Sequence, residues 1–167
     1  MEFDLKTISP EAVNRALAKA ERYRLLNEPW EAESICRDAL EIEPDNQEAL
    51  TTLLLALTEQ FDDDASTVVK ACATVGRLRD EYERAYYAGI VAERRAKARL
   101  RHGTPGCGPQ AYEWLRDAMN WYEKAEAIRP AGNDDARLRW NACARLIDRK
   151  RELAPAADEP YEPLLSE

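Results

Sequence analysis

The sequence predicts an all-α protein built as an array of helical hairpins, and three observations support this prediction. Apolar residues recur at helical intervals along most of the chain, as in residues 47–61. The four cysteines lie 35, 35 and 36 residues apart, which indicates a repeat of about that length. Two distant segments also share one spacing of a small residue, a larger residue, a second small residue and a proline: Ala32, Cys36, Ala39 and Pro44, and Ala118, Tyr122, Ala125 and Pro130.

This shared spacing predicts two helices that pack closely against a neighbour. Small side chains seven residues apart let another helix approach, and the larger side chain fills the space between them. Proline ends a helix because it has no backbone N–H to donate and its ring clashes with the preceding turn. We therefore predict helix ends just before Pro44 and Pro130.

The composition fits one domain followed by an acidic tail. The chain has 167 residues, of which 34% are charged and 45% hydrophobic, as in ordinary globular proteins. The net charge is −8, but residues 152–167 contain five acids and no base, which leaves 27 acids and 24 bases in residues 1–151. We expect one domain over residues 1–151 and disorder over residues 152–167. This domain is nearly balanced in charge, which argues against a nucleic-acid partner.

No membrane or secretion signal is evident in the sequence. It contains no run of about 18 apolar residues, and the first ten residues, MEFDLKTISP, lack the basic and apolar regions of a signal peptide. We expect a cytoplasmic protein without a membrane partner. The cysteine spacing has no metal-binding signature, and cytoplasmic thiols are usually reduced. We therefore expect no metal and no other cofactor.

Residues 13–46 resemble one tetratricopeptide repeat. The segment WEAESICRDALEIEPDN matches the second helix of that repeat of about 34 residues, where the family has Ala, Phe or Tyr, Ala and Pro at the spacing described above. Ala16, Ala20 and Tyr23 fall at three first-helix positions of the family. Ala16 stands in place of a tryptophan or leucine, however, and Lys19 in place of a leucine. The alternative is a helical hairpin that shares the spacing by chance.

The rest of the domain is expected to continue the array. Residues 47–79 predict a second hairpin, which is degenerate because no proline follows its second helix. Ala118 lies 86 residues after Ala32, whereas two ideal repeats would span about 68. The extra residues, about 18, fall between residues 80 and 130, so we expect an elongated third hairpin there. Residues 134–151 are expected to form a capping helix that covers the end of the array.

The segment RLRHGTPGCGPQAYEW, residues 99–114, has two interpretations. It brings the only histidine, His102, close to Cys107 among three of the six glycines, as a thiol-dependent enzyme or redox sensor would require. The second interpretation is a turn, in which Gly103 ends one helix and Pro109 lies in the first turn of the next. We favour the turn, because a glycine-rich tip is a poor platform for catalysis.

The family resemblance implies a function in binding other proteins. Tetratricopeptide arrays are non-enzymatic adaptors, assembly factors or chaperones that hold a partner peptide or helix in a concave groove. The first helix of each repeat lines that groove. Transferred onto this sequence, the groove residues are Asn14, Leu17, Glu21 and Arg24 in the first repeat, Thr51, Leu55 and Thr58 in the second, and Tyr86, Ile90 and Arg94 in the third.

Two residues of this sequence argue against one known way in which the family binds peptides. The clamp that holds the C-terminal EEVD peptide of chaperones uses lysine and asparagine where this sequence has Leu17 and Glu21. We therefore expect a partner peptide of another kind.

A basic arm extends along the helix before Gly103, formed by Arg95, Lys97, Arg99 and Arg101 next to Arg94. It would suit an acidic peptide or a phosphate, and the acidic tail of the same chain is one candidate occupant. The alternative is a solvated helix face whose cations favour the helix C-terminus. An elongated hairpin would also expose apolar surface, which allows a homodimer.

Overall fold

The protein is all-helical in the computed structural model, which describes residues 3–62, 64 and 66–155. Within these residues, one short 3-10 helix and seven α-helices are present, and strands are absent. The elements are η1 (Pro10–Ala12), α1 (Val13–Leu25), α2 (Pro29–Ile42), α3 (Gln47–Thr58), α4 (Ser66–Val75), α5 (Glu81–His102), α6 (Cys107–Ala127) and α7 (Asp135–Arg149). The all-α prediction is confirmed. None of the described helices combines the length and apolar character that crossing a bilayer requires.

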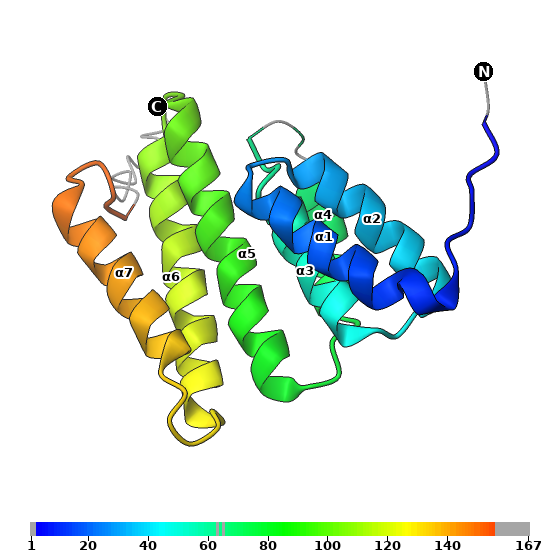
Figure 1. Cartoon of the computed structure of the whole chain (residues 1–167). Helices are drawn as coiled ribbons and strands as arrows, with labels where there is room; N and C mark the ends of the chain where they lie inside the picture. The colour runs from blue at the N-terminus through cyan, green and yellow to red at the C-terminus, as the bar shows by residue number, and fades with distance from the viewer. Residues whose placement is uncertain (1–2, 63, 65, 156–167) are drawn as a thin grey trace, which may run out of the picture.

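The helices pack in the order of the chain, so that each lies against the next (Figure 1). α1 also contacts α3, and α3 contacts α5, which places these odd-numbered helices in one row. α1 and α7 stand at opposite ends of the array (Figure 1). A surface along this row therefore draws side chains from segments about one hairpin apart in the sequence.

The third hairpin is the longest. α5 has 22 residues and α6 has 21, whereas the other α-helices have 10 to 15, so these two helices account for the surplus residues. Gly103, with φ 62°, follows α5, and Gly106, with φ 75°, precedes α6. Glycine adopts this left-handed conformation without a steric penalty. The segment around His102 and Cys107 therefore forms the turn at the tip of the hairpin.

Local sequence signals set most helix ends. α2 ends at Ile42 and α6 at Ala127, shortly before the two prolines of the repeated spacing. The side chain of Asn46 accepts a hydrogen bond from the N–H of Ala49 at 2.9 Å at the start of α3. Asp80 accepts one from Glu83 at 2.8 Å at the start of α5. Such caps satisfy backbone donors that the first helical turn leaves free.

Two apolar cores share α5. Leu17, Leu50 and Leu54 belong to the first core, between α1, α2, α3 and α4, and α5 adds Val91 and Ala98 to it. The second core lies between α5, α6 and α7 and contains Leu115, Tyr122 and Cys143. α5 adds Ile90 and Ala96 to this core. Because α5 packs on both sides, it holds the two halves of the array together.

The predicted disorder of residues 152–167 is wrong for their first part. Leu153 is buried in the second core, and the carbonyl of Glu152 lies so close to Gly108 that a Cβ there would be 2.2 Å from its oxygen. Residues 152–155 turn back onto α6 because burying Leu153 removes apolar surface from water. Residues 156–167 lie outside the described part of the chain.

Candidate functional site

A cavity of about 410 Å³ lies along the row of α1, α3, α5 and α7, and we call it the polar groove. It opens between the turn after α1, the end of α3, the C-terminal half of α5 and the start of α7. The lining residues are Asn27, Thr58, Glu59, Asp62, Glu93, Arg94, Lys97, Arg101 and Arg139. Four cations and three carboxylates thus share one small cavity.

A ladder of charged residues crosses the first three odd-numbered helices at one side of the polar groove. Arg24 donates to Glu59 from Nε at 3.2 Å and from Nη2 at 2.7 Å. Arg94 donates to the hydroxyl of Thr58 at 2.9 Å and to Glu59 at 3.3 Å. Burial alone would lower the pKa of Arg24, but the hydrogen bonds and charge of Glu59 raise it. Glu59 is therefore held between two guanidinium groups.

Glu93 forms the floor of the polar groove. Its side chain is fully buried, and it accepts a hydrogen bond from the hydroxyl of Tyr122 on α6 at 2.6 Å. It also pairs with Lys97 one turn later and with Arg139 of α7 at 3.4 Å. Burial alone would raise the pKa of Glu93, but the hydrogen bonds from Lys97 and Tyr122 lower it, so the group is a carboxylate. This carboxylate connects α5, α6 and α7.

The tip of the third hairpin is tied to the segment after α3. Arg101 donates from Nε to Asp62 at 2.7 Å, and Nε2 of His102 lies 3.8 Å from the same carboxylate. Cys107 is half-buried at the start of α6, and no hydrogen bond of its thiol is found among the described residues. His102 therefore faces Asp62, and within the described part of the chain it makes no hydrogen bond to the Cys107 thiol.

The cations of the polar groove lie outside its carboxylates. The side chain of Arg101 is 58% exposed, that of Lys97 39% and that of Arg139 33%. The partner carboxylates Asp62 and Glu93 are 34% and 0% exposed. A ligand that approaches from solvent therefore meets positive charge first. Guanidinium groups in this position suit carboxylates or phosphates, which they bind with two hydrogen bonds.

The structure brings three of the predicted groove residues together. Arg24, Thr58 and Arg94 meet at the ladder described above. Glu21 is exposed on α1 and pairs with Arg24 at 2.8 Å, while Asn14 is exposed near the start of the same helix.

Four of the other predicted groove residues serve packing: Leu17, Leu55, Tyr86 and Ile90. Leu17 and Ile90 are buried in the first and second core, so their expected position on an open groove is wrong. Tyr86 stacks on Tyr82 with ring centroids 5.8 Å apart, and Leu55 packs against the same core. Residues 86, 90, 94, 97 and 101 follow one another at intervals of three or four, so they share one side of α5. The second core covers this side at residues 86 and 90, and it opens into the polar groove from residue 94 onward.

Thr51 makes a local contact on α3. Its side chain is half-buried, and its hydroxyl donates to the carbonyl of Gln47 at 2.8 Å. This hydroxyl is therefore used within its own helix.

The predicted basic arm does not form one surface. Lys97 and Arg101, four residues apart, both line the polar groove. Arg95 instead stacks on the ring of Trp114 at 3.9 Å. Arg99 is half-buried, and its Nε lacks a hydrogen-bond partner among the described residues. Side chains two residues apart on a helix point about 200° apart, so alternate basic residues lie on different sides of α5.

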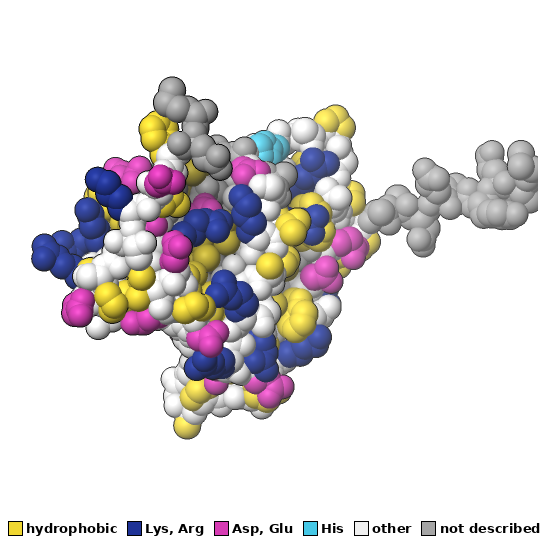
Figure 2. Space-filling model, turned by 90° about the vertical axis from the view of Figure 1, so that its right-hand side faces the viewer, with side chains coloured by type: hydrophobic (Ala, Val, Ile, Leu, Met, Phe, Trp, Pro, Cys, Tyr) yellow, Lys and Arg dark blue, Asp and Glu magenta, His cyan; other side chains and the backbone are white. Residues whose placement is uncertain are grey.

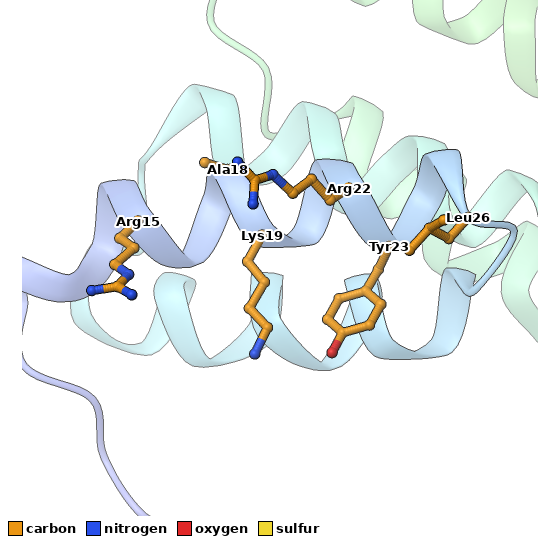
Figure 3. A pocket seen from close by; sticks show the side chains of 6 residues that line it. All are labelled: Arg15, Ala18, Lys19, Arg22, Tyr23 and Leu26. Carbon is orange, nitrogen blue, oxygen red and sulfur yellow. The ribbon is translucent and has the colours of Figure 1, made fainter.

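Two further hollows lie elsewhere on the molecule. An apolar groove of about 530 Å³ between α4, α5 and α6 contains Trp114, Trp121 and several valines. A hollow of about 620 Å³ lies on α1 alone, between Arg15, Lys19 and Leu26 (Figure 3). On the face that α1 and α2 present, basic and acidic side chains are interspersed (Figure 2). The α1 hollow therefore has no second element to complete it.

Sequence reasoning missed Glu59, Asp62, Glu93 and Arg139. A signal for Glu59 was present, because it lies 35 residues from both Arg24 and Arg94, the interval already seen between the cysteines. Glu93 and Arg139 are 46 residues apart, and their meeting depends on how α7 packs. The cysteine interval does not give equivalent positions throughout, because Cys72 is exposed whereas Cys36 and Cys143 are buried.

No family model, curated protein or solved structure matches this chain.

Proposed function

We propose that this chain is a non-enzymatic protein-interaction module that binds an acidic segment of a partner protein in the polar groove. We further propose that its hairpins are tetratricopeptide-type repeats and that it acts in the cytoplasm. The family-like spacing in residues 13–46 and the packing of α1, α3 and α5 in one row support the repeat assignment. The observation that carries the binding proposal is the layer of cations that covers the groove carboxylates.

The geometry favours a carboxylate ligand over an uncharged one. Arg94, Arg101 and Arg139 are held in place by the carboxylates beneath them, so binding orders few additional side chains. Each guanidinium has donors left over after its internal pair, because arginine carries five N–H groups. A partner aspartate or glutamate would accept from these donors. The contact is expected to weaken with salt, because most of the cations remain partly exposed.

A thiol-dependent enzyme has weaker support. It would need His102 to act on Cys107, but the imidazole faces Asp62. Cys107 also lies at the start of α6, directly after the glycine-containing turn at the tip, and such a tip is a poor platform for catalysis.

The binding proposal can be tested by fluorescence anisotropy with two labelled peptides. One is a short peptide of alternating glutamate and leucine, and the other has glutamine in place of glutamate. We expect the acidic peptide to bind the protein more tightly, and a Lys97→Glu/Arg101→Glu variant to lose about tenfold or more in affinity, since each charged hydrogen bond contributes about 1.5–3 kcal/mol.

The matched control is a Lys19→Glu/Arg22→Glu variant, which makes the same charge change on the α1 hollow. It should bind the acidic peptide nearly as well as the unmodified protein. Equal losses in both variants would show that only net charge matters, and equal binding of the two peptides would overturn the carboxylate preference.

A further inference from the structure

The chain leaves the described fold beside the polar groove. α7 ends at Arg149, and Leu153 then anchors the chain in the second core. The carbonyl of Glu152 lies against Gly108 at the start of α6, next to the tip of the third hairpin. Residues beyond Pro155 therefore start close to the C-terminal end of α5, where Arg101 lies.

A second cavity, which we call the rim cavity, adjoins the groove at this point. It measures about 360 Å³ and is lined by Lys97, Leu100, Arg101, Leu146 and Lys150. Lys97 and Arg101 also line the polar groove, so the two cavities are continuous through these side chains. The lining combines three partly exposed cations with two leucines. Lys97 and Arg101 pair with Glu93 and Asp62, and Nζ of Lys150 lies 3.2 Å from the carboxylate of Glu152. Such a surface suits a peptide that carries both acids and leucines.

The segment that follows has this composition. Residues 156–167, AADEPYEPLLSE, contain four acids, no base, a tyrosine and two adjacent leucines. A chain of this length spans up to about 40 Å when extended, so it can reach both cavities from Pro155. Tethering a ligand to its site gives an effective concentration on the order of 1 mM, which favours binding even when the intrinsic affinity is low.

We propose that residues 156–167 bind within the same molecule across the rim cavity and the polar groove. Their carboxylates pair with Lys97 and Arg101, and their leucines cover Leu100 and Leu146. This segment then occupies the groove that a partner's acidic segment would use, and a partner must displace it. The competition rests on the proposed function, whereas the intramolecular contact does not.

The tether selects this surface over a second basic surface, the hollow on α1. Arg15, Lys19 and Arg22 line the hollow on α1, but α1 stands at the opposite end of the array from α7 (Figure 1). The hollow on α1 also lacks a lining from a second helix. Charge alone would allow either surface, and the position of Leu153 decides between them.

Carbodiimide cross-linking of the full chain tests the contact directly. The reagent joins a carboxylate to a lysine amine that touches it, and the six lysines are Lys6, Lys19, Lys70, Lys97, Lys124 and Lys150. We expect mass spectrometry of the monomer to show residues 156–167 joined to Lys97. Lys150 is near in sequence and serves as the proximity control. Two results would overturn the proposal. One is that links to Lys19, Lys70 or Lys124 are as frequent as those to Lys97, and the other is that the links occur only in a dimer.

Displacement provides a second, independent measurement. The probe is a fluorescein-labelled peptide of residues 156–167, added to the full chain or to a full chain with Asp158→Asn, Glu159→Gln, Glu162→Gln and Glu167→Gln. If the site binds the segment with a Kd of about 0.1 mM, the tethered copy should weaken probe binding about tenfold. The neutralised chain should therefore bind the probe about tenfold more tightly.

The outcomes separate this proposal from the proposed function. Equal probe affinity for the two chains would overturn intramolecular binding. Binding of the alternating glutamate–leucine peptide at the groove would then still support the proposed function. Two double variants of the neutralised chain test the assigned surface. It is confirmed if Lys97→Glu/Arg101→Glu abolishes probe binding and Lys19→Glu/Arg22→Glu does not.

Discussion

Replacement of Gly89 by alanine tests the packing between α5 and α6. A Cβ at Gly89 would lie 2.5 Å from Cε1 and 2.7 Å from Cδ1 of Tyr122. Carbon atoms in ordinary contact are about 3.5–4.0 Å apart, so the ring would have to move by about 1 Å. Tyr122 is fully buried, and its hydroxyl is held by Glu93 at 2.6 Å. The ring therefore has little freedom to move without loss of this hydrogen bond.

The energies of three effects decide whether Gly89→Ala stabilises or destabilises the protein. Alanine in a helix interior is about 1 kcal/mol more favourable than glycine. Overpacking a buried site costs about 1–3 kcal/mol, and weakening a hydrogen bond to a charged group costs up to about 1.5–3 kcal/mol more. We expect Gly89→Ala to lower the free energy of unfolding by about 2 kcal/mol, although helix propensity alone predicts a gain.

Urea unfolding followed by circular dichroism measures this change, provided that the slope of the transition stays constant. The control is the same substitution in a Tyr122→Leu background, where the ring is absent. There Gly89→Ala should be neutral or stabilising by up to about 1 kcal/mol. A higher urea midpoint for Gly89→Ala in the unmodified protein would refute the close packing of Tyr122 on Gly89.

Three further predictions concern stability and reactivity. The fold lowers the pKa of Glu93 from its ordinary 4.5. The ionised carboxylate therefore contributes to the free energy of unfolding above pH 4.5, and this contribution is lost as the pH falls through the lower pKa of the folded state. Glu93→Gln should therefore flatten the acid side of the stability–pH curve, and an unchanged curve would contradict the assignment. Gly103→Ala should lower the free energy of unfolding by about 1 kcal/mol, because alanine is strained at the left-handed φ of this position. A Cβ there meets nothing within 4 Å, so no steric clash adds to this cost. An unchanged urea midpoint would argue against this turn. Burial raises the pKa of Cys36 and Cys143 to about 12, so iodoacetamide should modify the exposed Cys72 of the native protein first; equal rates by mass spectrometry would contradict this burial.

Part of the polar groove could be predicted from the sequence, because its ladder follows the repeat interval. The register of the repeats predicts Arg24, Thr58 and Arg94, which meet in the structure. The same register misplaced Leu17 and Ile90, which are buried. Leu17 and Arg24 are seven residues apart and lie on the same side of α1, and Ile90 and Arg94 share a side of α5 in the same way. Whether such a position is buried or open therefore depends on how far along the helix the packing of the neighbouring helices extends, which the register does not encode.

The helices themselves follow from short-range chemistry. Prolines after α2 and α6, the caps Asn46 and Asp80 and the left-handed Gly103 each act within about one turn of the helix end that they set. These signals are readable in a linear sequence because the groups that interact are only a few residues apart. They also account for the length of the third hairpin and for the turn between His102 and Cys107.

Only the tertiary structure decided which charges meet. Glu93 pairs with Arg139 of α7 and with Tyr122 of α6, and these contacts depend on how three helices are rotated against one another. The return of Leu153 onto the second core likewise decides which basic surface adjoins residues 156–167. Such contacts join residues that are tens of positions apart, so no local pattern encodes them. The packing of α5 between two cores is the physical cause, because it turns one side of that helix toward Tyr122 and leaves Lys97 and Arg101 partly open to solvent.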